Sequence, residues 1–334
     1  MTQAAMETRV SEQVRALAEG DFTHIADRFA NAGFRVRLPA RGILQLSSSG
    51  HMLRRPALLL SVGVHGDETA PIEMLAGLLD ALAAQPHALA VDLMVVVGNI
   101  AAIAQGRRFI DADLNRMFRE ARGDLQSAAE AARADTIMRA TAGFFAAPDA
   151  DKWHLDLHTA IRASRYPAFA VVPEAVAGPR RDALLGFLGR AGIEAAILSP
   201  ASAGTYSAHT AQMFGATSAT VELGQVGMLG ANDLDRFDAA RHAIDAFLRT
   251  VRVPAGTAPA VFRVAQELVK RSDAFRMAFG RDTENFTAMA PGSLIAEDGD
   301  LAYRVGAQTE YVVFPNPDVR PGLRAGLMVV REDG

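Results

Sequence analysis

The stretch PALLLSVGVHGDETAPIEMLAGLLDALAA, residues 56–84, passes from one hydrophobic pattern to another within a few residues. Its aliphatic run, 57–64, is typical of a strand that is buried on both faces. Later in the stretch apolar side chains recur with helical spacing, which predicts a helix over 70–84. Between the two patterns lie His65 and Glu68, which rarely follow a core strand directly. A strand, a polar loop and a helix in this order predict an α/β unit.

The same alternation continues along most of the chain. Five further aliphatic runs predict buried strands, at 91–98, 153–157, 168–172, 195–198 and 217–223. Helical patterns separate several of them, at about 125–146, 179–191 and 232–251. Two short alternating strands are predicted within 34–48, and an amphipathic helix within 1–20. Together these patterns predict an α/β fold in which a sheet has helices on both faces.

The pattern changes near Pro254. Proline and glycine become frequent there, and alternating β patterns with many turn signals follow without a long helix. Such spacing is typical of a small all-β unit. We therefore predict two domains, an α/β domain over residues 1–253 and a small β-rich domain over residues 254–334.

Composition limits the chemistry that is available to the chain. It has 334 residues, of which 50% are hydrophobic and 22% are charged, and its formal net charge is −4. Lys and Arg are dispersed along the chain, so no nucleic-acid partner is indicated. The sequence contains no cysteine. This excludes disulfides, a thiolate nucleophile and cysteine-based metal centres, and it leaves His, Asp and Glu as metal ligands.

The N-terminal region and the longest apolar stretch bear on location. The first residues mix acidic and basic side chains and lack the apolar core of a signal peptide. The longest apolar stretch, 88–104, is interrupted by Asp92 and is shorter than a membrane span. We therefore expect a cytoplasmic protein without a membrane partner. The sequence does not fix the oligomeric state and is compatible with a homo-oligomer.

Chemically active side chains stand at the ends of several predicted strands. His65 and Glu68 follow one aliphatic run, His158 follows another, and Glu222 lies at the end of a third. Ligands of open α/β sheets bind beyond the carboxyl ends of the strands, so these side chains are expected at one edge. His65, Glu68 and His158 would form a His₂Glu set that leaves one position for water, as in a catalytic zinc site. We predict one Zn²⁺ per chain, with Asp156 as a candidate partner that orients His158.

Each of these residues also has an ordinary explanation. The His-x-x-Glu spacing is common by chance, so His65 could be a loop histidine and Glu68 an acid that the helix dipole favours. His154 lies an even number of residues before His158 and stays a weak rival ligand. For His209 we expect a surface position, with a place in a substrate loop as the alternative. The metal site is favoured over these explanations because several strand ends place such side chains at the same edge of the sheet.

Other polar residues indicate proton transfer and an anionic substrate. A carboxylate at the end of a core strand is costly to bury unless it pairs, binds a metal or transfers a proton, which makes Glu222 a candidate base. The alternative is an acid that faces solvent. The segment GRRFIDADLNRMF, 106–118, is either a solvated loop with weak ion pairs or a source of arginines for substrate carboxylates. Asp113 could support an arginine or a metal-binding histidine, and Arg162 could reach the same pocket.

Nucleotide-binding and serine-hydrolase motifs are missing from the sequence. It has no G-x-x-x-x-G-K phosphate loop, no G-x-G-x-x-G after a strand and no G-x-S-x-G elbow. The prediction of function therefore depends on the candidate metal site.

Five segments occur in the order in which one known family has them. They are GVHGDETAPIEML (63–75), RFIDADLNRMF (108–118), WHLDLHTAIR (153–162), VELGQ (221–225) and EYVVFPNPDVRPGLRAGLM (310–328). From roughly residue 30 onward the chain resembles the succinylglutamate desuccinylase/aspartoacylase family, which is similar in fold to the zinc carboxypeptidases. The resemblance implies a zinc-carboxypeptidase-like mixed sheet flanked by helices. The segments HTAIR and NDL favour the desuccinylase branch.

The resemblance implies an activity and a role for each matching residue. The implied reaction is zinc-dependent hydrolysis of N2-succinyl-L-glutamate to succinate and L-glutamate, the closing step of succinyl-dependent arginine breakdown. The implied roles are zinc ligands for His65, Glu68 and His158, general base for Glu222, carbonyl polarisation for Arg108, and substrate carboxylate binding for Asn115, Arg116 and Arg162.

Three other functions stay open at this point. An aspartoacylase-like enzyme would act on N-acetylaspartate or another N-acyl amino acid. A carboxypeptidase of the same fold would cleave short peptides. A zinc-bound binding protein would hold the metal without hydrolysing any acyl amino acid, which a candidate base at Glu222 argues against.

Overall fold

The computed structural model describes residues 10–48, 55–147, 150–200, 204–250 and 252–332. Twelve of their strands form one mixed sheet, in the spatial order β1 (Arg35–Ala40), β2 (Ile43–Ser47), β4 (Asp92–Val97), β3 (Ala57–Val62), β5 (Lys152–Ala160), β8 (Thr217–Gln225), β6 (Ala168–Pro173), β7 (Ala195–Ser199), β9 (Ala260–Val269), β15 (Arg324–Arg331), β14 (Glu310–Val313) and β11 (Thr287–Met289). The central strands β4, β3, β5 and β8 are parallel. Their carboxyl ends therefore meet at one edge.

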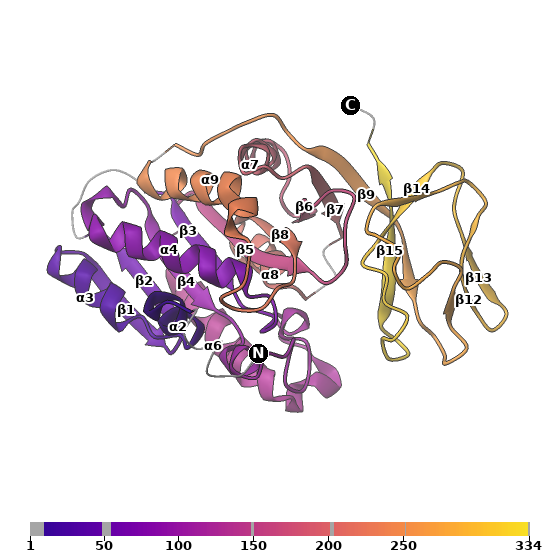
Figure 1. The fold of residues 1–334 in the computed structure, drawn as a ribbon, viewed down its shortest axis with the longest axis horizontal. Helices are drawn as coiled ribbons and strands as arrows, with labels where there is room; N and C mark the ends of the chain where they lie inside the picture. The colour runs from indigo at the N-terminus through magenta and orange to yellow at the C-terminus, as the bar shows by residue number, and fades with distance from the viewer. Residues whose placement is uncertain (1–9, 49–54, 148–149, 201–203, 251, 333–334) are drawn as a thin grey trace.

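Helices cover both faces of the part of the sheet formed by β1 to β8, as Figure 1 shows. One face packs against α2 (Glu12–Ala18), α3 (Thr23–Asn31), α4 (Ala70–Ala84), α7 (Pro179–Arg190) and α9 (Asp238–Arg249). The other face packs against α6 (Ala129–Phe144) and α8 (Tyr206–Phe214). Among the described residues, no helix combines the length and the apolar character that crossing a membrane requires.

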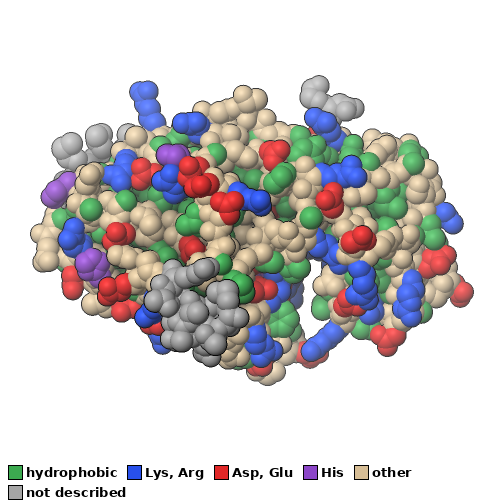
Figure 2. All heavy atoms as spheres, in the orientation of Figure 1, with side chains coloured by type: hydrophobic (Ala, Val, Ile, Leu, Met, Phe, Trp, Pro, Cys, Tyr) green, Lys and Arg blue, Asp and Glu red, His purple; other side chains and the backbone are tan. Residues whose placement is uncertain are grey.

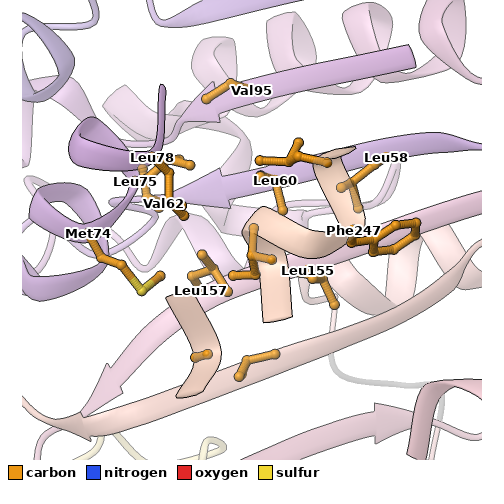
Figure 3. Close-up of a cluster of buried hydrophobic side chains, with 14 of the residues drawn as sticks. Leu58, Leu60, Val62, Met74, Leu75, Leu78, Val95, Leu155, Leu157 and Phe247 are labelled. Carbon is orange, nitrogen blue, oxygen red and sulfur yellow. The ribbon is translucent and has the colours of Figure 1, made fainter. Parts of the chain in front are cut away.

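The core beneath α4 and α9 is made of hydrophobic side chains (Figure 3). Leu58 and Leu60 of β3 and Leu155 of β5 point into it, against Leu78 of α4 and Phe247 of α9. Full burial of one such side chain contributes roughly 1.5–3 kcal/mol. Because side chains alternate along a strand, the residues between these leucines point to the opposite face, towards α6 and α8. The candidate site lies on that second face.

The C-terminal region continues the same sheet. β9 pairs in parallel with β7, from Ala195↔Ala260 to Leu198↔Arg263, and antiparallel with β15. A second sheet of three strands, β10 (Arg276–Met277), β12 (Leu294–Asp298) and β13 (Leu301–Arg304), packs over it around a separate apolar cluster. The prediction of an α/β domain with a small C-terminal β domain is confirmed. Figure 2 shows a notch between the two parts, with Lys and Arg side chains on both sides of it.

The predicted elements lie close to the observed ones, with informative differences. The helix predicted over 70–84 is α4, which has these bounds. The strand predicted over 57–64 ends at Val62, because Gly63 has a φ of +62° and turns the chain. Of the helix predicted within 1–20, the described part begins at Glu12, and residues 1–9 lie outside the described residues.

The expectation of a surface or loop position for His209 is wrong. His209 lies in α8, is 8% exposed and packs its ring edge against Phe214. The helix begins where the Thr205 side chain accepts from the Ala208 N–H, and it ends at Gly215 with a left-handed backbone. Its polar residues are buried against the sheet, so it lacks the polar outer stripe by which a helix is predicted.

Candidate functional site

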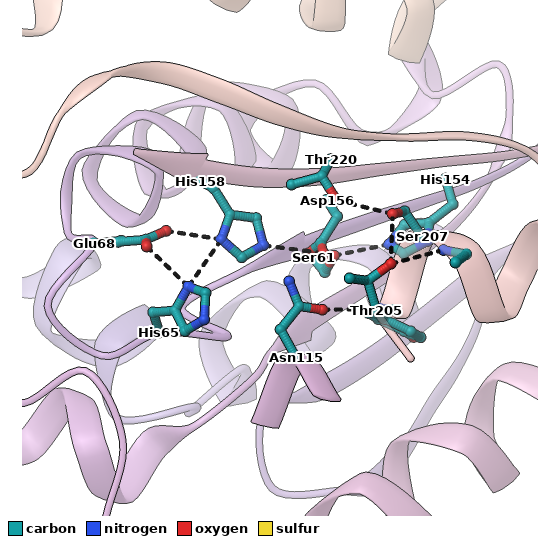
Figure 4. A network of polar contacts seen from close by, with 12 residues as sticks. Ser61, His65, Glu68, Asn115, His154, Asp156, His158, Thr205, Ser207 and Thr220 are labelled. Carbon is teal, nitrogen blue, oxygen red and sulfur yellow. Dashed lines mark hydrogen bonds and ion pairs between the residues drawn. The ribbon is translucent and has the colours of Figure 1, made fainter. Parts of the chain in front are cut away.

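His65, Glu68 and His158 converge at the carboxyl ends of β3 and β5 (Figure 4). The Nδ1 atoms of the two histidines lie 3.2 Å apart. Each of them lies 2.8 Å from a different oxygen of the Glu68 carboxylate. All three side chains are buried, and the candidate ligand atoms lie within 4.8 Å of one another. Two imidazoles and a carboxylate in this arrangement can hold a divalent metal ion.

Two glycines shape the loop that carries two of these ligands, residues 63–69. Gly63 provides the left-handed turn at the end of β3. A Cβ on Gly66 would lie 2.3 Å from backbone atoms of α5 (Ile100–Ala104), so no larger residue fits there. The Gly66 N–H also donates to the carbonyl of Arg108, at 3.1 Å. Close backbone packing therefore fixes the place of the loop.

An aspartate lies behind each histidine. His65 Nε2 lies 2.9 Å from Asp113 Oδ1, and His158 Nε2 lies 3.0 Å from Asp156 Oδ2. With a proton on each Nε2 facing an aspartate, each Nδ1 can offer its lone pair to a metal ion bound beside Glu68. Asp156 thus lies where the sequence predicted an orienting partner, and Asp113 contacts a histidine with one of its oxygens.

These carboxylates change the acidity of the histidines. Burial alone would lower the pKa of His158, but Asp156 and Glu68 outweigh it and raise the pKa well above its ordinary value. In the same way Glu68 and Asp113 raise the pKa of His65 against its burial. The pKa of Glu68 is well below its usual range, because the two histidines outweigh the effect of burial. The pocket therefore favours positive charge between its carboxylates.

Ser61 and His154 support Asp156 from the far side, as Figure 4 shows. Ser61 Oγ donates to Asp156 Oδ1 at 2.5 Å and lies 2.8 Å from His154 Nε2. His154 Nδ1 lies 2.8 Å from Thr210 Oγ1 of α8. Burial lowers the pKa of His154 to about 4, so its ring is neutral at neutral pH. Sequence reasoning missed Ser61, although a lone hydroxyl in an aliphatic strand was a signal.

Glu222 lies next to His158, since the two residues are paired across β8 and β5. It is 8% exposed, and among the described residues its buried Oε2 has no hydrogen-bond partner. Burial raises the pKa of Glu222 to about 7, and the charge of Glu68 adds to this shift. A carboxylate with this pKa and a free oxygen can take up and release a proton near neutral pH.

Arg108 lies at the open side of the metal-binding residues. Its Nη1 donates to Glu68 Oε1 at 2.7 Å, and its side chain is 30% exposed.

The loop that follows Arg108 is held by Glu130 of α6, whose side chain is buried. Glu130 accepts hydrogen bonds from the backbone N–H of Ile110 at 2.6 Å and from Nδ2 of Asn99 at 3.1 Å. Sequence reasoning missed Glu130, whose one signal was an acid in the first turn of an alanine-rich helix.

Asn115 and Arg116 follow Asp113 in a short 3₁₀ turn. Asn115 is buried, and its Oδ1 accepts from the Tyr206 N–H at 2.9 Å, so it ties this turn to the start of α8. Arg116 is 41% exposed, and its Nη1 donates to the Asn115 carbonyl. Burial and the nearby charge of Arg116 lower the pKa of Arg324, on β15, to about 10. Sequence reasoning missed Arg324 as a neighbour of Arg116 because it comes from the C-terminal domain.

Arg162 lies in the segment 161–167, between β5 and β6. The pKa of Asp318, in the C-terminal domain, is lowered first by its hydrogen bond from Arg281 and also by the charge of Arg162. This interaction places Arg162 near Asp318 of the C-terminal domain.

Two family models match the chain. The Succinylglutamate desuccinylase/Aspartoacylase catalytic domain matches residues 54–248. The AstE/AspA barrel-sandwich hybrid domain matches residues 257–332. The first range contains all of the predicted site residues, and the second contains β9 to β15.

Several similar proteins bear one name. A protein of Burkholderia orbicola (strain MC0-3), named succinylglutamate desuccinylase, is 46% identical over 279 residues, which are 83% of this chain and 81% of that protein. The solved structure of succinylglutamate desuccinylase from Vibrio cholerae has a TM-score of 0.82 and 34% identity, and covers 90% of this chain and 88% of its own. The corresponding structure from Chromobacterium violaceum has a TM-score of 0.78 and 36% identity, over 93% and 98%. With both domains matched in order, the chain belongs to the succinylglutamate desuccinylase/aspartoacylase family.

Proposed function

We propose that the protein is a zinc-dependent hydrolase that cleaves the amide of N2-succinyl-L-glutamate, giving succinate and L-glutamate in arginine catabolism. The identity of 46% to a relative named succinylglutamate desuccinylase supports the substrate. The observation that carries the chemistry is Glu222, a buried carboxylate with a free oxygen and a pKa of about 7, next to the ligand cluster. The site lies within the proposed catalytic domain, residues 1–253, and the proposed small β-rich domain is 254–334.

The donor set suits one zinc ion per chain. His65 and His158 offer Nδ1 atoms, Glu68 offers a carboxylate, and each histidine is oriented by an aspartate. Three protein ligands of these types leave a fourth position open, as in catalytic zinc sites. When zinc is bound by these three residues, it acts as a Lewis acid that polarises a carbonyl and lowers the pKa of bound water.

Glu222 moves the proton of the reaction. Its carboxylate takes a proton from the attacking water as the new C–O bond forms at the succinyl carbonyl carbon. When the C–N bond breaks, Glu222 returns that proton to the departing glutamate nitrogen. The water oxygen stays on succinate in its new carboxyl group, and the second proton passes from that group to the amine or to solvent. A base with a pKa near the working pH performs both steps well.

Arginines and Asn115 bind the charges of the substrate. Arg108 stabilises the developing oxyanion, a contribution on the order of 3 kcal/mol for one well-placed donor. Asn115 and Arg116 bind the carboxylates of the glutamate part, and Arg162 binds the carboxylate of the succinyl part. Guanidinium groups suit this task, because their planar donors pair with carboxylates in a bidentate way.

The test is the release of glutamate from N2-succinylglutamate by the purified protein, with and without a chelator. Glu222→Gln is the matched variant, and we expect it to lower kcat by roughly 10²–10⁴-fold. N-acetylaspartate and a short peptide are assayed in parallel. Faster turnover of N-acetylaspartate would make the protein aspartoacylase-like, and bound zinc without any hydrolysis would make it a binding protein.

A further inference from the structure

One residue of the C-terminal domain, Asn285, holds the segment 161–167. The Asn285 N–H donates to the Ala163 carbonyl at 2.9 Å, and the Asn285 carbonyl accepts from the Arg165 N–H at 3.1 Å. The two bonds form a parallel bridge between segments that are far apart in the sequence. The chain that leaves β5 is thus fixed by the other domain just after the metal-binding strand.

The backbone around Asn285 is unusual. Asn285 is 1% exposed, and its Oδ1 accepts from the Phe314 N–H at 2.8 Å. Phe286 and Phe314 have φ angles of +63° and +54°, and among the described residues they are the non-glycine residues with positive φ. The Phe286 ring packs against Tyr166 and Phe169, with centroids 4.9 and 5.2 Å away. Bulky residues keep such a conformation only where the surroundings enforce it, and these positions cluster at functional sites.

The held segment carries Arg162. Arg162 follows His158 by four residues, so at about 3.3 Å per residue their Cα atoms are at most ~13 Å apart. An acyl carboxylate a few bonds beyond the scissile carbonyl is within reach of a side chain as long as arginine. A shift of the segment would move this guanidinium while leaving the metal ligands in place.

We propose that Asn285 is a positioning residue through which the C-terminal domain sets the place of Arg162, and with it the affinity for acyl chains that end in a carboxylate. The inference rests on the proposed function, because it takes Arg162 as the group that binds the acyl carboxylate. The Asn285 side chain acts by ordering its own backbone, which bonds to the segment directly.

The test compares Asn285→Ala with Asn285→Asp, which keeps an acceptor oxygen for Phe314. Glu284→Gln is the matched control, since it removes only an exposed 3.9 Å ion pair to Arg165. Kinetics are measured on N2-succinylglutamate and on N2-butyrylglutamate, whose acyl chain ends in a methyl group. Hydrogen exchange of residues 161–167 and the zinc content of each variant are measured alongside. Asn285→Ser replaces Asn285→Ala if the latter does not fold.

For Asn285→Ala we expect exchange at 161–167 to be at least tenfold faster and KM for succinylglutamate at least tenfold higher. We expect kcat within threefold, full zinc content, and an unchanged kcat/KM for butyrylglutamate. Asn285→Asp and Glu284→Gln should stay within threefold of the unmodified protein. Unchanged exchange, or equal losses on both substrates, would overturn the inference. If the unmodified protein releases no glutamate from succinylglutamate, the proposed function fails, and the assignment of the acyl carboxylate fails with it.

Discussion

Replacing Glu222 with glutamine is expected to stabilise the metal-free protein at alkaline pH, although it removes the proposed base. The pKa of Glu222 rises from the ordinary 4.5 to about 7 in the folded chain, a difference that corresponds to about 3 kcal/mol. An acid with a raised folded pKa is protonated more readily in the folded than in the unfolded state. Its ionisation therefore costs stability as the pH rises from the unfolded pKa to the folded one.

The assay is urea unfolding of chelator-treated protein at pH 5 and pH 8. At pH 8 the variant should be more stable by about 3 kcal/mol, and at pH 5 by about 1 kcal/mol, because most Glu222 side chains of the folded protein are then protonated. Glutamine has the shape of the protonated acid and never ionises. Glu297→Gln, at an exposed position of β12, controls for the loss of one negative charge and should change stability by less than about 0.5 kcal/mol.

The outcome that contradicts this reasoning is a Glu222→Gln variant whose stability differs from that of the unmodified protein by the same amount at both pH values. A pH-independent difference would show that Glu222 is not held against ionisation by its surroundings. The proton-transfer role would then lose its physical basis, whatever the activity of the variant.

Three further predictions concern the metal-binding residues and the loop that carries two of them. Asp156→Asn and Asp113→Asn should each weaken zinc binding by about 10–100-fold in a chelator competition, because each aspartate orients one of the two metal-binding histidines. Unchanged affinity would show that these contacts are incidental. Zinc affinity should fall between pH 8 and pH 6, since the raised pKa values of His65 and His158 make the metal compete with protons; calorimetric titrations at both pH values measure this, and equal affinities would refute it. Gly66→Ala should lower the free energy of unfolding by about 3 kcal/mol, because its Cβ would lie 2.3 Å from the α5 backbone. Denaturant unfolding measures this, and an unchanged midpoint would show that the alanine is tolerated.

The central sheet and the ligand cluster could be predicted because each follows from a local pattern. Aliphatic runs of the lengths at 57–64 and 217–223 fit a parallel strand that is buried on both faces. Once such strands are placed, the carboxyl-end rule brings His65, Glu68 and His158 together without knowledge of the packing. The alternation of side chains likewise placed Asp156 on the same side as His158.

The rest of the site depends on contacts that no local pattern encodes. Asp113 contacts both His65 and Arg116, because it lies in a loop whose path is fixed by Glu130, on another element. Arg324 and Asn285 approach from the C-terminal domain, and a residue's distance in sequence carries no signal of such an approach. α8 was missed for a related reason, since its polar residues bond inward, to the sheet.

The supporting layer around the histidines has an electrostatic consequence. Asp113 and Asp156 lie against the two imidazoles, and Glu68 lies between them. In the metal-free protein this arrangement raises the pKa of both histidines, which means that the pocket favours two protons. A divalent ion that displaces two protons leaves the net charge of the pocket unchanged, so the same carboxylates that hold the protons suit the metal.

The carboxylate of Glu222 is not paired with either histidine and takes no part in this charge balance. The aspartates have a histidine each, and Glu68 contacts both histidines and Arg108. Glu222 is the buried acid of the cluster whose pKa is raised and whose Oε2 is left without a partner among the described residues. A carboxylate that pairs firmly with a cation is a poor base, because ionisation is then too favourable for it to hold a proton. The pairing of the other three acids therefore singles out Glu222 as the group that can carry a proton between water and the leaving amine.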